Sequence, residues 1–216
     1  MTYEYGFDEQ LAMSEGVAAT CNVVDVLLAN IPGSLGVCKA HETNDRTGTD
    51  WWIEMNTGRH LSVDAKVRSQ DWSAKTNGAQ DDLALEVWSV KGRKCADGSR
   101  DNTRVVGWTR DDKKRTDYVL WLWTDTRRFC LIPFPMLCAV FTDKCDQWYK
   151  KNKHSEQFTP PRHHGQHGYW SECVFVPRRD VWAEIYLRYS PTLGLAETKS
   201  KETQKGLFDT AQNVGE

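Results

Sequence analysis

Two acidic residues and a lysine in one short stretch of this chain are of the types that could hydrolyse a phosphate ester. Asp50 precedes Asp64 by fourteen positions, and Lys66 follows Asp64 at a spacing of two. Two carboxylates can hold a divalent cation, and a nearby lysine adds positive charge and can orient or deprotonate an attacking water. These residues indicate metal-assisted hydrolysis, provided that the fold brings them together.

A β-hairpin is the element predicted to position them. Residues 49–68, TDWWIEMNTGRHLSVDAKVR, read as two strands joined by a tight turn at 56–58. The second strand alternates, so one face carries Leu61, Val63, Ala65 and Val67 and the other carries Ser62, Asp64, Lys66 and Arg68. The first strand adds Asp50, Trp52 and Glu54 on one face. The alternative interpretation is an exposed cross-strand charge ladder, which would contribute little to stability.

Two further acids could join this site. Glu15 lies on the apolar stripe of a predicted helix over residues 7–31, where a carboxylate either faces a site or marks a solvated break at 14–16. Glu86 lies in a predicted strand over residues 83–90. In an alternative register, Asp64 is the upstream acid and Glu86 the second one, with Trp88 in the usual place of the lysine. Both registers keep Asp64 and Lys66 at the centre.

The arrangement resembles the PD-(D/E)XK nuclease superfamily, in particular its phage- and plasmid-type members. Gly48-Thr49-Asp50 and Asp64-Ala65-Lys66 carry the resemblance, with Glu15 in the position of an acid that some members place on the first helix. The stretches 82–89, 107–110 and 114–123 extend it, so that it covers residues 7–141. Thr49 departs from the pattern, because a proline usually precedes the first acid.

The resemblance implies a restriction-endonuclease-like α/β core and a Mg²⁺-dependent nuclease that acts on DNA, with Mn²⁺ as a possible substitute. Asp50, Asp64 and the backbone carbonyl of Ala65 would bind the metal, and Lys66 would position or activate the water. Glu15 or Glu86 would serve a second metal or orient the water. Many nucleases of this fold cut both DNA strands as dimers, so the resemblance also implies a possible homodimer.

The remaining pattern predicts a mixed central β-sheet flanked by helices. Strands are expected over 36–42, 117–123, 129–133 and 172–176, and helices over 135–149 and after Pro177. Residues 69–81 and 91–104 are expected to be loops, and the polar stretch 150–170 is expected to include a surface loop over 160–170. One nuclease-like domain over 1–190 and a flexible tail over 191–216 complete the predicted organisation.

Basic side chains that could contact substrate phosphates are Arg68, Arg110, Lys113, Lys114 and Arg115. The run 113–115 precedes a predicted core strand, and its alternative interpretation is a solvated basic turn. A separate constellation of His163, His164, His167 and Cys173 has ligand types that zinc accepts, although its spacing fits no strong zinc pattern. That segment could instead be a pH-sensitive loop that contacts DNA.

Bulk composition restricts the class of protein. The chain has 216 residues, 27% of them charged, and a net charge of −2, so any nucleic-acid contact must be a local basic patch. Seven cysteines without a CxxC pair, a polar N-terminus and the lack of a long apolar run predict a reduced cytoplasmic protein with no membrane span, in a bacterial host if it is phage-encoded. Two other functions stay open: a nucleic-acid-binding or interaction protein of the same fold that does not hydrolyse, and a zinc-stabilised binding module.

Overall fold

The computed structural model describes residues 23–41, 48–161 and 167–190. The chain divides into two compact units, Met1–Arg178 and Arg179–Glu216. The first unit holds both β-sheets and the candidate site. In the second, the described residues 179–190 are helical. Within the described residues, no helix combines the length and apolar character needed to cross a bilayer.

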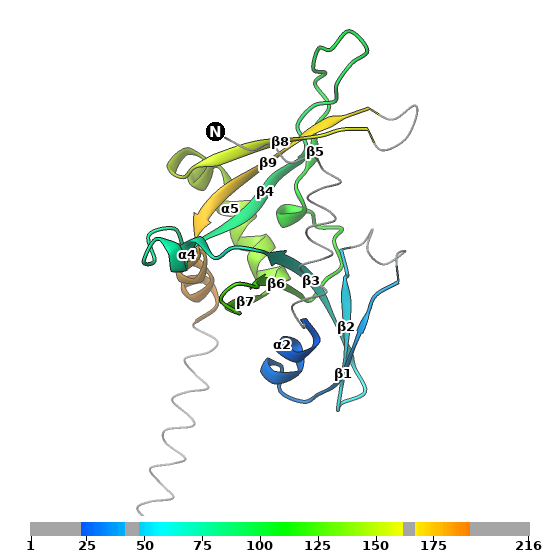
Figure 1. The fold of residues 1–216 in the computed structure, drawn as a ribbon, viewed down its shortest axis with the longest axis vertical. Helices are drawn as coiled ribbons and strands as arrows, with labels where there is room; N and C mark the ends of the chain where they lie inside the picture. Colours follow the sequence, from blue (N-terminus) through cyan, green and yellow to red (C-terminus); the bar gives the residue numbers. More distant parts are fainter. Residues whose placement is uncertain (1–22, 42–47, 162–166, 191–216) are drawn as a thin grey trace, which may run out of the picture. The chain divides into compact units, whose positions relative to one another are not determined.

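The first sheet has five strands in the order β1-β2-β3-β6-β7 (Figure 1). Its strands are β1 (Ser34–Lys39), β2 (Trp51–Met55), β3 (His60–Arg68), β6 (Tyr118–Trp123) and β7 (Phe129–Pro133). β3 and β6 are parallel, whereas every other neighbouring pair is antiparallel. The mixed sheet expected from the sequence is therefore confirmed, as is the hairpin that β2 and β3 form.

A second sheet corrects the expectation of one central sheet. It contains β4 (Asp82–Val90), β5 (Val105–Val106), β8 (His154–Thr159) and β9 (Tyr169–Pro177), in the order β5-β4-β9-β8. The predicted strand over 83–90 forms, but it pairs with β9 rather than with the hairpin. β8 lies in the polar stretch 150–170, for which the sequence predicted no strand before residue 172. Five of the six residues of β8 are exposed, so no apolar alternation reveals it.

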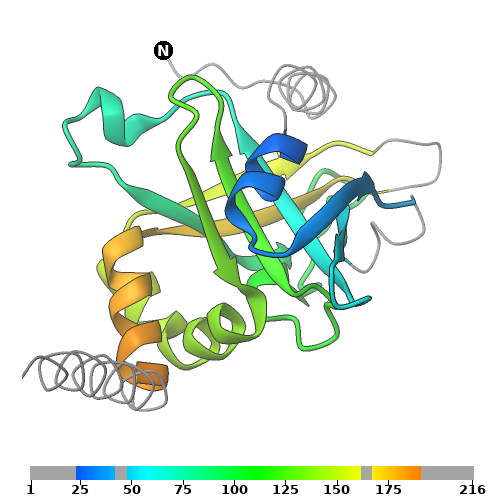
Figure 2. The same ribbon diagram turned by 90° about the horizontal axis from the view of Figure 1, so that it is seen from below.

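Packing against α2 (Val23–Asn30) explains why the odd-numbered residues of β3 are apolar. Val23 and Leu27 of this helix are buried in one core cluster with Val63, Val67 and Leu120. Figure 2 shows α2, in blue, lying along the strands of this sheet. The polar residues of β3 therefore point to the opposite face of the sheet, away from α2.

The other helices lie between or beside the sheets. α5 (Phe134–Lys151) contacts β6 and β7 of the first sheet and β9 of the second, and Leu137, Val140 and Phe141 form its buried stripe. This confirms the predicted helix over 135–149, with a proline in its first turn. A short helix, α4 (Trp72–Lys75), interrupts the predicted loop over 69–81. Residues 7–22 of the predicted first helix and the predicted tail over 191–216 lie outside the described residues.

Candidate active site

Asp50, Asp64 and Lys66 lie together at the junction of β2 and β3. The Asp50 carboxylate accepts a hydrogen bond from the backbone N–H of Ala65 at 2.7 Å. The Lys66 ammonium lies 2.6 Å from Asp64 Oδ1, and a second ammonium, that of Lys114, contacts Asp64 Oδ2. The structure thus joins the predicted residues into one cluster and adds a lysine from fifty positions along the chain.

Burial of Asp64 decides between the two sequence-based interpretations of the hairpin. Only 2% of the Asp64 side chain is exposed, compared with 24% for Lys66 and 8% for Lys114. An exposed charge ladder would leave all of these groups in water, so that alternative is wrong. A buried carboxylate is costly unless it is paired, and here both of its oxygens have cationic partners.

The two carboxyl groups have very different proton affinities. Burial, followed by repulsion from Asp64, raises the pKa of Asp50 to about 6, although the Ala65 N–H and Lys66 oppose this shift. Burial also acts to raise the pKa of Asp64, but Lys66 and Lys114 outweigh it, so the pKa of Asp64 lies below its ordinary value. Asp50 is also held at the backbone N–H of Ala65, the residue that follows Asp64. The pair is therefore close enough for one cation to contact both.

Lys114 reaches Asp64 because the start of β6 is fastened to the hairpin. The Thr49 hydroxyl donates to the Arg115 carbonyl at 3.0 Å, and Asp117 accepts from the backbone N–H and hydroxyl of Ser62. Gly48 supplies the space: its φ is +85°, and a Cβ there would lie 2.5 Å from Lys114 Cε. Burial lowers the pKa of the Lys114 ammonium, while Asp64 acts in the opposite direction.

The ring of Trp108 contacts the ammonium groups of both lysines. It opens the short 3₁₀ helix η1 (Trp108–Arg110), and its ring lies 4.9 Å from Lys66 Nζ and 4.7 Å from Lys114 Nζ. Cations are attracted to the face of an indole ring, so Trp108 stabilises the two lysines in this position. The sequence placed residues 107–110 within the resemblance, but it favoured core packing for Trp108 and did not predict this contact with the two lysines.

Glu86 contributes by holding η1. Its carboxylate accepts hydrogen bonds from the Ser89 hydroxyl and, at 2.9 Å, from the backbone N–H of Trp108. Glu86 belongs to β4 in the second sheet. The sequence offered Asp50 and Glu86 as alternatives for the second acid beside Asp64. Asp50 is the one that lies there, whereas Glu86 holds the backbone of Trp108.

The donor set suits a hard divalent cation, because it consists of two carboxylates and a carbonyl. The Val63 carbonyl accepts from the Asp50 N–H, whereas the Ser62 and Arg68 carbonyls accept from residues that flank β6. Odd-numbered carbonyls of β3 thus face the β2 side, and that of Ala65 lies past the last paired residue of the β2–β3 ladder. Asp50, Asp64 and the Ala65 carbonyl therefore fit Mg²⁺, on the condition that Lys114 releases Asp64 Oδ2.

The candidate phosphate-binding residues do not form a single patch. Arg68 and Lys113 are exposed. Arg110 lies 4.8 Å from the Trp88 ring and donates to the Val87 carbonyl, so it supports β4. Arg115 is exposed, and its backbone carbonyl anchors Thr49. The three residues of the run 113–115 therefore do not behave alike. Lys113 and Arg115 are exposed, whereas Lys114 points into the protein and pairs with Asp64.

The proposed zinc constellation receives little support from Cys173, which is half-buried. Burial, followed by repulsion from Glu86, raises the pKa of the Cys173 thiol to about 12 and so favours the protonated form over the thiolate that binds zinc. His167 is exposed, while His163 and His164 lie outside the described residues, as does Glu15. Across the described ranges, no group of three or more His, Cys, Asp or Glu side chains is placed to hold a metal ion.

Comparisons with known proteins leave the site to be judged on its geometry. No protein-family model, curated protein or solved structure matches this chain.

Proposed function

We propose that this protein is a divalent-cation-dependent nuclease that hydrolyses phosphodiester bonds in DNA. The observation that carries the proposal is that Asp50 accepts from the backbone N–H of Ala65, the residue between Asp64 and Lys66, while Lys66 Nζ lies 2.6 Å from Asp64. These are the residues on which the resemblance to the PD-(D/E)XK superfamily rests. Their meeting at one buried point supports a shared chemical role.

Asp50, Asp64 and the Ala65 carbonyl are the groups that would hold Mg²⁺. When bound there, the ion supplies positive charge to the scissile phosphate and makes a coordinated water more acidic. Asp50 must lose any proton that it carries before it can act as a ligand, because burial and Asp64 favour its protonated form.

Lys66 is the group that orients the attacking water. Its side chain is partly exposed, so its ammonium can reach both Asp64 and an incoming phosphate ester. Hydrogen bonding to Asp64 and contact with the Trp108 ring fix where the ammonium lies. A positioned cation at this point also stabilises negative charge that builds on the phosphoryl oxygens in the transition state.

A second candidate function is nucleic-acid binding without hydrolysis. The observation that favours it is the occupation of both Asp64 oxygens by ammonium groups, which gives two carboxylates and two lysines a balanced charge without any metal. If Lys114 never leaves Asp64, the cluster would hold β3, β6 and η1 together and would not bind a cation. The two functions differ in whether cleavage occurs and whether divalent cations bind.

The test is a cleavage assay on single- and double-stranded DNA and RNA, with Mg²⁺, Mn²⁺ or EDTA. We expect the wild type to cut DNA only with a divalent cation, and Asp64→Asn and Asp50→Asn to lose cutting while keeping their circular dichroism spectra. Glu54→Gln, an exposed carboxylate on β2, is the matched control and should retain full activity. Cation-independent cutting, or equal activity in all four proteins, would rule out the proposed nuclease, whereas DNA binding without cutting would favour the second candidate.

A further inference from the structure

A large cavity opens beside the candidate site, between the two sheets of the first unit. Its volume is about 660 Å³, within the range of small-ligand sites. Arg68, Trp121 and Trp123 line it from the first sheet, and Ala84 and Phe175 line it from the second. Asp50, Asp64 and Lys66 do not line this cavity, so the function of the cavity has to be considered separately from theirs.

Two connections place the cavity next to the acidic cluster. Arg68 follows Lys66 by two residues on the same face of β3, and Trp121 is the residue that pairs with Lys66 across the β3–β6 ladder. The Trp108 ring, which lies under Lys66, is also 6.1 Å from the Trp121 ring. A ligand that extends from the cavity would therefore reach Lys66 within a short distance.

Four of the thirteen residues that line this cavity are aromatic. Trp121, Trp123 and Phe175 contribute from the strands, and Trp72 contributes from α4 with 55% of its surface exposed. Among the described residues, the Trp121 indole N–H is buried without a hydrogen-bond partner. Trp121 and Trp123 are only 1% and 6% exposed, and the Arg128 guanidinium lies 4.3 Å from the Trp123 ring. The aromatic surface open to a ligand is therefore that of Trp72 and of the half-buried Phe175, and such surface can stack on a planar ring.

The charge of the lining is suited to an anion. Three basic and two acidic side chains line the cavity. Arg128 is neutralised by Asp71 and Asp81, whereas Arg68 and Lys153 form no ion pair with any described residue. Both of these side chains are exposed at the cavity, where they could donate hydrogen bonds to a phosphate group.

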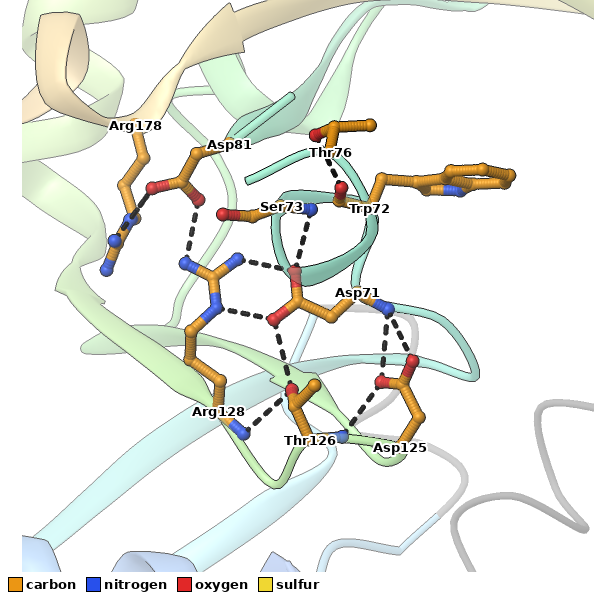
Figure 3. Close-up of polar contacts among 9 residues, drawn as sticks. All are labelled: Asp71, Trp72, Ser73, Thr76, Asp81, Asp125, Thr126, Arg128 and Arg178. Atoms are coloured by element: carbon orange, nitrogen blue, oxygen red, sulfur yellow. Dashed lines mark hydrogen bonds and ion pairs between the residues drawn. The ribbon is translucent and has the colours of Figure 1, made fainter. Parts of the chain in front are cut away.

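A network of ion pairs fixes the wall that carries Trp72. Arg128 donates to both oxygens of Asp71 and to Asp81, and Arg178 donates to Asp81. Figure 3 shows this connected network, with the Trp72 side chain pointing away from it. The segment between β3 and β4 is thereby held to β7 and to the end of β9, so Trp72 is presented on a fixed support.

We propose that this cavity binds one unpaired nucleotide of the substrate strand, with its base against Trp72 and Phe175 and its phosphate at Arg68 and Lys153. The inference rests on the proposed nuclease function and specifies its substrate as a single-stranded end or an unpaired nucleotide beside the scissile bond. A planar base accounts for the aromatic lining, and the adjoining phosphate accounts for the two unpaired cations. A base-paired duplex would not enter a volume of this size.

Binding without divalent cations tests the cavity separately from cleavage. The probe is a short single-stranded DNA that carries one 2-aminopurine, whose fluorescence falls when it stacks, compared with the same sequence in a duplex. We expect the full-length protein to bind the single strand more tightly and to quench its fluorescence. Trp72→Ala and Arg68→Ala should each weaken this binding about tenfold, and Trp72→Ala should also reduce the quenching.

Tyr186→Ala, which removes another exposed aromatic residue, is the matched control and should bind as the wild type does. Thermal unfolding of each variant verifies that it is folded. Equal affinity for single strand and duplex, no binding at all, or full quenching by Trp72→Ala would overturn the cavity proposal. Cleavage without quenching would refute the cavity and leave the nuclease standing, whereas quenching with no cleavage under any metal would do the reverse.

Discussion

Lys114 is the residue that most changes how the site is understood. Its ammonium contacts Asp64 Oδ2 at a place where a metal-binding carboxylate would need an open oxygen. Its surroundings are dry, with the Trp108 and Phe134 rings 4.7 and 5.7 Å away. Because burial lowers the pKa of this ammonium, the contact with Asp64 is what keeps it charged there. Lys114 therefore occupies the oxygen that a divalent cation would need, and under the proposed function it would compete with that cation.

Lys114→Met is expected to tighten divalent-cation binding several-fold. Methionine keeps an unbranched apolar chain over the aromatic rings but frees Asp64 Oδ2, while Lys66 still pairs with Oδ1. Calorimetric titration with Mn²⁺ would measure the change. The matched control is Lys113→Met, an exposed neighbour whose removal should leave the affinity unchanged. Unchanged or weaker binding by Lys114→Met would mean that Lys114 does not compete with a cation.

At the level of elements, η1 packs against β4 so closely that only a glycine fits at position 107. A Cβ on Gly107 would overlap the Glu86 carbonyl group, and the Gly107 N–H also donates to the Val87 carbonyl at 3.0 Å. The glycine thus allows η1 to lie directly on β4, which in turn fixes Trp108 beneath the lysines.

Gly107→Ala is expected to lower the free energy of unfolding by about 2 kcal/mol, because the added methyl group must push η1 away from β4. Displacement of Trp108 should also reduce cleavage. Urea unfolding followed by tryptophan fluorescence would measure the stability. Gly36→Ala is the control, since its nearest neighbour would be the Glu54 carboxylate at 3.8 Å. A Gly107→Ala protein as stable as the control would show that η1 is not tightly held.

A second element-level feature is the attachment of α4 through Asp71. This residue is 1% exposed, caps α4 by accepting from the Ser73 N–H, and accepts two hydrogen bonds from Arg128. Those bonds with Arg128, more than any other contact, hold the pKa of Asp71 below its ordinary value of 3.8 in spite of burial. A carboxyl whose pKa is depressed by folding stabilises the folded state above its unfolded pKa and loses that effect as the pH falls.

Asp71→Asn is therefore expected to lower the free energy of unfolding by about 2 kcal/mol at pH 6, because asparagine cannot form the charged pair with Arg128. The deficit should shrink at pH 3, below the ordinary pKa of 3.8, because the carboxyl group of Asp71 in the unfolded wild type is then protonated. Urea unfolding at both pH values would measure it, with the fully exposed Asp97→Asn as control. An equal deficit at both pH values would contradict the role of the Asp71 charge.

For the whole molecule, local pattern was enough to predict the hairpin and much of the first sheet. Alternation along β3 determined which of its residues meet α2, since a shift of one position would bury Asp64 and Lys66 against that helix. The continuous apolar run of β6 marked a strand with neighbours on both sides, and β3 and β7 are those neighbours. These features could be read because burial on one face imposes a period of two on the sequence.

Contacts between distant segments could not be predicted in this way. Nothing distinguishes Lys114 from Lys113 and Arg115 in the sequence, and its inward direction depends on Gly48, Thr49 and Asp117 holding the chain in place. The second sheet was missed because β4 pairs with β9 across more than eighty residues and β8 is polar. The cavity between the sheets follows from that same long-range pairing.

The rate of DNA cleavage by Lys66→Ala, measured with saturating Mg²⁺ and compared with wild type, tests the central claim most directly. We expect cutting to fall by about a hundredfold or more, because the water loses the cation that orients it. Lys39→Ala, an exposed lysine on β1, should cut as fast as the wild type. If Lys66→Ala cut DNA as fast as Lys39→Ala, the cluster at Asp50 and Asp64 would not be the site of hydrolysis.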